Sequence, residues 1–285
     1  MTPIAFNPKS SHHRCKWLLP AILAIGLFGW GLNIWGQTFE NSIHRYLGEG
    51  QWEQINGQLK QVSVGTADVV WGINFQGDVF KYQDNGTWEQ INGRLNQISV
   101  GSDGTIWGLS VEGNVYKYQG NNAWEEIEGD LDQISVGNVT TVWGINYEHN
   151  IFKYLENGNW KQINGQLDQI AVGDDGTAWG VNSAGSVYQY RGDNKWKKEN
   201  VELHQISVGN LKKAWNKTAK IKQISIGNAK EIWGIDFDDN VYKYKGGKKW
   251  EQIDGQLKQI SVGSDGTVWG VYWRYVNQSA LPSSQ

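Results

Sequence analysis

Residues Trp88 to Gly101 read WEQINGRLNQISVG. This stretch returns almost unchanged as WEQIDGQLKQISVG from Trp250 to Gly263. The closing glycine recurs in steps of 36 residues, with a single step of 18 near the end, at Gly65, Gly101, Gly137, Gly173, Gly209, Gly227 and Gly263. Because a repeat of this length cannot bury its own apolar face, its copies must pack on one another as one array.

Each copy predicts four short strands. Ile98 and Val100 alternate with polar residues, which is typical of a half-buried strand. Asp103-Gly104 then predicts a two-residue type I′ turn that pairs Val100 with Trp107, and the serine of the first strand with the glycine after that tryptophan. The sheet would then have one bulky face and one nearly flat face, which lets neighbouring sheets approach closely.

The next turn holds, at one recurring position, residues that tolerate a left-handed backbone. These residues are Asn41, Gly77, Gly113, His149, Gly185 and Asp239. The pattern identifies His149 as a turn residue and not as a ligand or a base.

The third and fourth strands form a second hairpin. The third strand reads Val or Ile, aromatic, cation, Tyr, and a five-residue loop leads to a fourth strand that opens with tryptophan. If Tyr82 faces Trp88, then Lys81 faces Glu89, and the same register holds in the other copies. Four strands in 36 residues correspond to one blade of a β-propeller.

Complete copies begin at Leu59, Leu95, Leu131, Leu167 and Ile221. A sixth blade is divided between the ends of the chain, with strands at Ile43–Tyr46 and Trp52–Ile55 joined by Leu257–Gly263 and Val268–Val271. The prediction is therefore an all-β, six-bladed propeller over residues 37–275, closed by both termini, with a C-terminal tail over 276–285. Half a copy is left over at about 203–219. It fits a protruding hairpin, a strained seam or an error in the gene model.

The N-terminal segment, residues 1–36, predicts a hydrophobic helix. Lys9, Arg14 and Lys16 precede an apolar run from Trp17 to Trp35. As a helix this run would span about 28 Å, close to the thickness of a bilayer core. Both a retained signal-anchor and a cleaved signal peptide fit. In either case the array lies outside the cytosol, secreted or anchored by a transmembrane segment, because the basic flank stays cytoplasmic.

Composition argues against several classes of function. The chain has 285 residues and a net charge of −3, so no basic face predicts nucleic-acid binding. The only cysteine, Cys15, precedes the repeats, and the 5 histidines share no repeat position. No Cys/His spacing predicts a metal site. We therefore expect neither catalysis nor a cofactor.

These repeats resemble the tectonin family, which includes tachylectin-1-like lectins and fish-egg lectins. The matching residues are the Trp88–Gly101 and Trp250–Gly263 blocks, together with the Trp-Gly and Val-Tyr-Lys-Tyr motifs that follow. The resemblance covers roughly residues 35 to 275. It implies a six-bladed propeller and, from its lectin members, binding of cell-surface glycans that include bacterial lipopolysaccharide.

Two rings of side chains are candidates for contact with sugar. The tryptophans of the Trp-Gly motifs lie on an inner strand and are expected to be core. The tryptophans that open the outer strand are the predicted glycan-binding set: Trp52, Trp88, Trp124, Trp160, Trp196 and Trp250. A ring of cations could bind anionic sugars or could simply pair across strands: Arg45, Lys81, Lys117, Lys153 and Lys243.

The sequence thus favours a lectin that binds surface glycans through repeated weak sites, whose avidity would come from multivalency. The alternative is a membrane-tethered propeller scaffold that binds a protein partner. Both functions require binding and no turnover.

Overall fold

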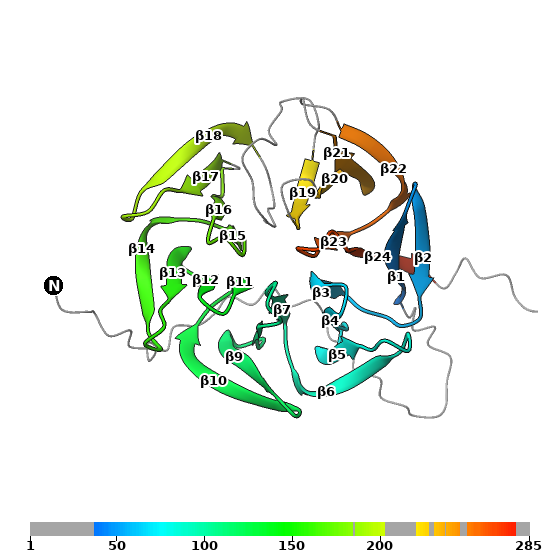
Figure 1. Ribbon diagram of the computed structural model, residues 1–285, viewed down its shortest axis with the longest axis horizontal. Helices are drawn as coiled ribbons and strands as arrows, with labels where there is room; N and C mark the ends of the chain where they lie inside the picture. Colours follow the sequence, from blue (N-terminus) through cyan, green and yellow to red (C-terminus); the bar gives the residue numbers. More distant parts are fainter. Residues whose placement is uncertain are drawn as a thin grey trace, which may run out of the picture.

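The computed structural model describes residues 37–184, 186–202, 221–227, 231–236, 238–245 and 250–277. These residues form six four-stranded antiparallel sheets around one axis, so the predicted six-bladed propeller is confirmed (Figure 1). The predicted N-terminal helix and the half-repeat at 203–219 lie outside the described residues. Of the tail predicted over 276–285, Val276 and Asn277 belong to a strand and the rest lies outside the described residues.

We name the sheets A to F in their order around the ring. Sheet A contains β23 (Gln259–Val262), β24 (Val268–Asn277), β1 (Gln37–Gly48) and β2 (Gln51–Ile55). Sheet B contains β3 (Gln61–Thr66), β4 (Val69–Ile73), β5 (Asp78–Tyr82) and β6 (Trp88–Arg94). Sheet C contains β7 (Gln97–Val100), β8 (Ile106–Leu109), β9 (Asn114–Gly120) and β10 (Ala123–Asp130). Sheet D contains β11 (Gln133–Asn138), β12 (Thr141–Ile145), β13 (Asn150–Tyr154) and β14 (Trp160–Gln166). Sheet E contains β15 (Gln169–Val172), β16 (Ala178–Val181), β17 (Ser186–Tyr190) and β18 (Trp196–Glu202). Sheet F contains β19 (Ile221–Ile226), β20 (Ile232–Asp236), β21 (Asn240–Tyr244) and β22 (Trp250–Gln256).

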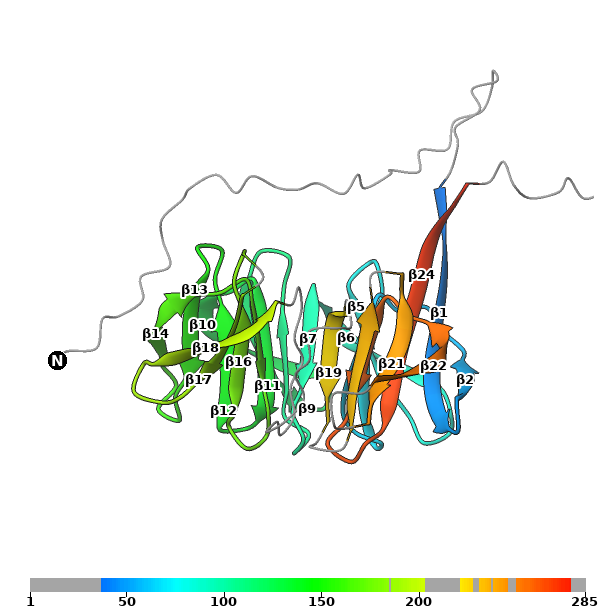
Figure 2. The ribbon, with the colours of Figure 1, turned by 90° about the horizontal axis from the view of Figure 1, so that it is seen from above.

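Sheet A closes the ring with strands from both ends of the chain, as the sequence predicts. β1 pairs with β24 from Arg45 opposite Trp269 to Gln37 opposite Asn277. β1 has 12 residues, whereas its counterpart β5 has 5. The extra length continues past the ring as a two-stranded ribbon, which projects from one side of the disc (Figure 2). We call that side the ribbon face.

The first hairpin differs from the prediction by one residue. Val100 pairs with Ile106, and Ser99 pairs with Trp107. The loop has three residues and is closed by Gly101 N–H, which donates to Thr105 O at 2.8 Å. Gly104 has a positive φ of 82° and Asp103 does not, so the predicted type I′ turn is wrong. A type I′ turn needs a positive φ at both central residues, whereas in the longer loop the glycine alone adopts one.

The corrected register explains the serine and glutamine of the motif, because they join one sheet to the next. Gln61 Nε2 donates to Ile98 O at 3.1 Å, and Val100 N–H donates to Ser63 Oγ at 3.0 Å. Equivalent bonds link sheets C to D, D to E, F to A and A to B. In sheet E the serine is replaced by Ala171.

The recurring glycines allow close approach. A Cβ at Gly65 would lie 2.3 Å from the carbonyl oxygen of Gly101 in the next sheet. A Cβ at Gly108, in a Trp-Gly motif, would lie 2.3 Å from Leu95 Cδ1. The space beside the glycine of the Trp-Gly motif is therefore filled by the leucine that lies just before the first strand of the same sheet. The predicted close approach is correct, but isoleucine and not serine stands opposite the glycine.

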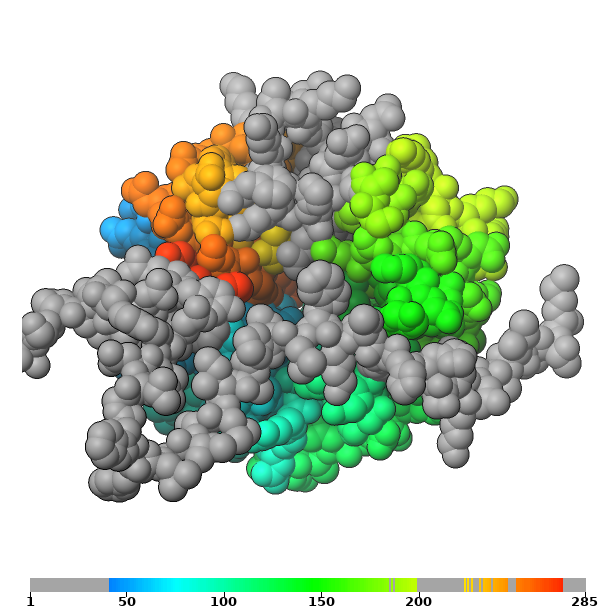
Figure 3. Space-filling model, turned by 180° about the vertical axis from the view of Figure 1, so that it is seen from behind, coloured from blue at the N-terminus to red at the C-terminus, as the bar shows by residue number. Residues whose placement is uncertain are grey.

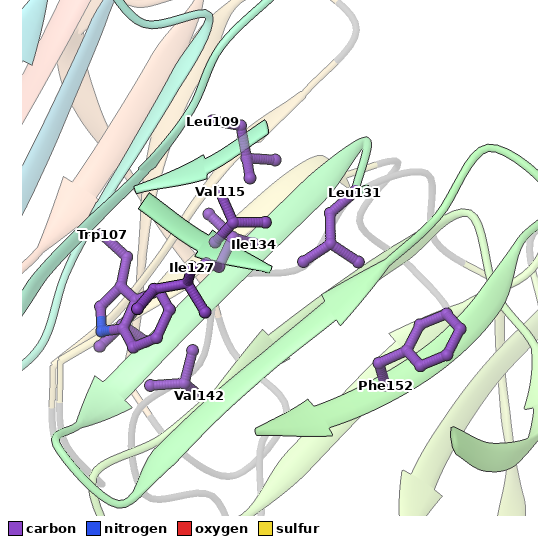
Figure 4. Packing of buried hydrophobic residues seen from close by; sticks show 9 residues of the cluster. Trp107, Leu109, Val115, Ile127, Leu131, Ile134, Val142 and Phe152 are labelled. Atoms are coloured by element: carbon purple, nitrogen blue, oxygen red, sulfur yellow. The ribbon is translucent and has the colours of Figure 1, made fainter. Parts of the chain in front are cut away.

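The core lies between sheets. The inner tryptophans Trp71, Trp107, Trp143, Trp179, Trp233 and Trp269 are buried, which confirms the prediction that they are core. Figure 4 shows one such cluster, in which Trp107, Leu109, Val115 and Ile127 of sheet C pack against Phe152 and other residues of sheet D. Each sheet thus buries its bulky face against the next one.

The second turn follows the prediction at most positions. His149 has a φ of 66° and Asp239 a φ of 68°, and Gly77 and Gly113 are also left-handed. His149 is therefore a turn residue. Asn41 is an exception, because β1 runs through this position without a turn and Asn41 lies in the strand. Gly185 lies outside the described residues.

Candidate functional site

The outer tryptophans lie between neighbouring sheets and contact aromatic rings of both. Trp88 packs edge-on against its cross-strand partner Tyr82 with ring centroids 5.0 Å apart, and the pairing is the one the register predicts. Its ring also lies edge-on to Trp269 of sheet A at 6.0 Å. The same arrangement recurs for Trp52, Trp124, Trp160 and Trp196. For Trp250 the described contact is with Tyr244 at 5.2 Å.

Four of the outer indole nitrogens donate hydrogen bonds. Trp88 Nε1 donates to Asn56 O at 2.9 Å, and equivalent bonds to the preceding sheet are made by Trp124, Trp160 and Trp196. The carbonyl lies next to a glycine whose missing side chain makes room for the ring, since a Cβ at Gly57 would lie 3.1 Å from the Trp88 indole. These rings remain half-exposed. Packing against the partner tyrosine is thus confirmed, with the rings tilted and not stacked, and contact with a glycan stays a prediction.

The ring of cations has structural partners. All predicted cross-strand pairs are present, including the like-charged pair Lys153–Lys161. Arg45 forms the expected ion pair with Glu53 at 2.6 Å. Other cations lie over the inner tryptophan of the neighbouring strand, such as Lys117 Nζ at 5.9 Å from the ring centre of Trp107. Lys153 and Lys243 lie over tryptophans in the same way.

A groove of about 790 Å³ lies between sheets F and A. Figure 3 shows the described surfaces of sheet F, in orange, and sheet A, in blue and red, side by side. Polar side chains, mostly amides, dominate its lining, which comprises Asn41, Ser42, His44, Gln54, Gln58, Asn240, Gln252, Asp254, Gly255, Gln256 and Tyr272. Side-chain amides offer both donors and acceptors, as sugar hydroxyl groups require.

His44 is one of the departures from the repeat that line this groove. In the third-strand motif, the position between Val or Ile and the following cation or Gln is aromatic in the other five blades: Phe80, Tyr116, Phe152, Tyr188 and Tyr242. At the junctions from sheet A to sheet E this ring packs on the core of the preceding sheet, as Phe80 does on sheet A and Tyr116 on sheet B. At the junction of sheets F and A the position holds His44, and the partly buried hydrophobic residues that pack on the core there are Tyr46 and Trp52. The smaller, polar side chain leaves space unfilled.

His44 is held within the groove. Its Nε2 lies 2.9 Å from Ser42 Oγ. Desolvation by burial lowers the pKa of His44 below its ordinary value of 6.5, which favours the neutral ring. Asp254 supplies a carboxylate to the lining. The sequence contains the signal for this site, namely His44 at an otherwise aromatic position, but the recurring motifs do not reveal it because His44 departs from them.

A smaller pocket of about 280 Å³ lies between sheets D and E. His149 Nδ1 lies 2.9 Å from Asp168 Oδ1 at its mouth. Within the described ranges no group of three His, Cys, Asp or Glu side chains could hold a metal ion. The same ranges contain no helix long and apolar enough to cross a membrane.

Comparison with known proteins agrees with this geometry. The family model described as Tectonin domain matches residues 27–216 and 211–278. No curated protein matches the chain.

Solved structures share the fold at low identity. Virginiamycin B lyase from Staphylococcus aureus is 11% identical with a TM-score of 0.50, covering 83% of this chain and 99% of its own. YCF48 from Cyanidioschyzon merolae is 13% identical with a TM-score of 0.50, covering 81% of this chain and 99% of its own. Likeness at this level concerns the fold alone, whereas the family match spans most of the sequence. The chain belongs to the tectonin domain family.

Proposed function

We propose that this propeller is a lectin that binds a neutral portion of a surface glycan in the groove between sheets F and A, without catalysis. The observation that carries the proposal is the amide-rich lining of that groove. Amides and a neutral histidine can exchange hydrogen bonds with hydroxyl groups, and Tyr272 offers a ring for the apolar face of a sugar.

The net charge of the lining favours a neutral or weakly basic sugar. Asp254 contributes a negative charge, and the low pKa of His44 leaves that side chain uncharged at neutral pH. Strongly anionic saccharides would be repelled. Within a bacterial lipopolysaccharide, the neutral sugars of the outer chain therefore suit this groove better than phosphorylated sugars.

The half-exposed outer tryptophans remain candidates for weaker, repeated contacts with the same surface. Such contacts would add avidity without changing the specificity of the groove. An extracytosolic location, which the N-terminal sequence predicts, would bring the propeller to such glycans.

The test is a glycan array that includes bacterial lipopolysaccharides, neutral oligosaccharides and methylated sugars, probed with the full chain and with His44→Phe. We expect related neutral hits for the native chain and their loss for the variant, because phenylalanine restores the packing of the other junctions. Equal binding by both proteins would reject the groove. A blank array with folded native protein would reject the lectin and leave the protein-binding scaffold as the better function.

A further inference from the structure

The ribbon face carries apolar side chains at one recurring turn position. In sheets B, C and D the first residue of the turn between the second and third strands is Phe75, Val111 or Tyr147. Their exposed fractions are 37%, 72% and 66%. The equivalent residue of sheet A, Trp273, lies 6.0 Å from Phe75 between ring centres. These four residues, which we call the apolar arc, occupy four consecutive sheets.

The turn itself does not require these side chains. It is closed by Asn74 N–H, which donates to Asp78 O at 3.1 Å, and by Gln76 N–H, which donates to Asn74 Oδ1 at 3.0 Å. Sheet E has Ser183 at the equivalent position. Single exposed apolar residues are ordinary, but a series on neighbouring blades of one face marks an interaction surface.

The chain that continues from this face indicates what covers it. β1 begins at Gln37 at the tip of the ribbon, and the apolar run Trp17–Trp35 ends two residues before that point. If that run spans a bilayer, the ribbon starts at the bilayer surface. Its four pairs beyond the ring, Gln37–Asn277 to Glu40–Arg274, span about 13 Å at roughly 3.3 Å each. The headgroup layer occupies about 5–8 Å of this length.

We propose that the apolar arc rests on the lipid bilayer that anchors the chain. A modest tilt of the propeller about the ribbon then closes the remaining gap between the headgroup layer and the ribbon face of sheets B to D. Aromatic and aliphatic side chains then enter the interface, where Trp and Tyr are favoured. The groove between sheets F and A lies on the other side of the ribbon from sheet B. Contact of the arc with lipid does not depend on the lectin proposal.

Charges beside the arc specify the lipid. Glu112 follows Val111 and Glu148 follows Tyr147, and both are exposed. Near Trp273 the cation is Lys258, which is paired with Asp239. Anionic headgroups would be repelled by the glutamates of sheets C and D, so the surface that fits is a zwitterionic one such as phosphatidylcholine.

The test measures depth in the bilayer at two matched positions. Cys15→Ser removes the only native thiol, and Val111→Cys or Val139→Cys then adds a single labelling site. Val139 is 54% exposed, but it lies in the β11–β12 turn at the opposite face. The full chain is labelled with an environment-sensitive dye and reconstituted in phosphatidylcholine vesicles that contain a lipid-borne quencher.

We expect quenching several-fold stronger at position 111 than at position 139, and weaker quenching at 111 in vesicles rich in phosphatidylserine. Adding Phe75→Ser and Tyr147→Ser should reduce the signal at 111 while near-ultraviolet circular dichroism stays native. Equal, weak quenching at both positions would overturn the proposal. Burial of the dye at 111 that persists in solution without vesicles would also overturn it, because a protein surface would then cover the arc.

Discussion

Trp88 Nε1 donates a 2.9 Å hydrogen bond to the carbonyl oxygen of Asn56, so the outer strand of one blade is bonded to the residue that follows the outer strand of the preceding blade. The same bond recurs at three other junctions. The outer tryptophans therefore hold the rim of the ring together, whatever they also bind.

Replacing Trp88 should separate packing from hydrogen bonding. Trp88→Phe keeps a ring against Tyr82 and loses the bond to Asn56, and we expect a cost of about 1 kcal/mol in the free energy of unfolding. Trp88→Ala should cost more, about 2–4 kcal/mol, because the gap between sheets is only partly refilled. Urea denaturation measures both values. Equal, negligible costs would show that Trp88 is not structural.

The central glycines should tolerate a methyl group unequally. A Cβ at Gly137 would lie 2.2 Å from the backbone oxygen of Gly173, whereas the closest atom at Gly101 lies at 3.0 Å. Gly137→Ala should therefore destabilise the propeller by about 3 kcal/mol. Gly101→Ala, the matched control, should cost clearly less. The same loss in both variants by thermal denaturation would contradict the close approach.

His44→Phe should stabilise the protein while it abolishes the groove. Filling a space of this kind typically adds about 0.5–2 kcal/mol. The pH dependence should also change. Because folding lowers the pKa of His44, the unfolded chain takes up a proton at higher pH than the folded chain does. The native free energy of unfolding therefore falls as the pH drops from about 6.5 towards the lowered pKa. The variant should lack this contribution, and an unchanged slope in denaturation series would show that His44 is not desolvated.

The cation ring should be structural. Lys117 stacks over Trp107 and faces Glu125, and such contacts contribute about 0.5–1 kcal/mol each. We expect Lys117→Met to lose no more than that and to bind neutral glycans normally. A selective loss of glycan binding, with stability unchanged, would instead assign the ring to the ligand.

The repeat made most of the fold predictable. The 36-residue step, the Trp-Gly motif and the offset of the copies predicted six blades and their closure by both termini. The register Lys81–Glu89 followed from an aromatic pair at a hairpin, and it is correct. The first hairpin was mispredicted because Asp-Gly is compatible both with a two-residue turn and with the three-residue loop that forms here.

The groove was not predicted because it depends on a residue that departs from the repeat. The recurring positions are those that build the blades, and the packing of the blades explains both the outer tryptophans and the cations. His44 and Tyr272 fall at positions where other blades have an aromatic residue and a polar turn residue. Only packing against sheet F shows that this exchange opens a cavity.

The stoichiometry of glycan binding distinguishes a single groove from repeated sites at the outer tryptophans. Isothermal titration of the full chain with the best soluble oligosaccharide from the array gives the number of sites, and His44→Phe and Trp124→Phe serve as paired variants. One site per chain that is lost in His44→Phe and kept in Trp124→Phe is the predicted result. Several equivalent sites that survive His44→Phe would contradict it and assign binding to the outer tryptophans.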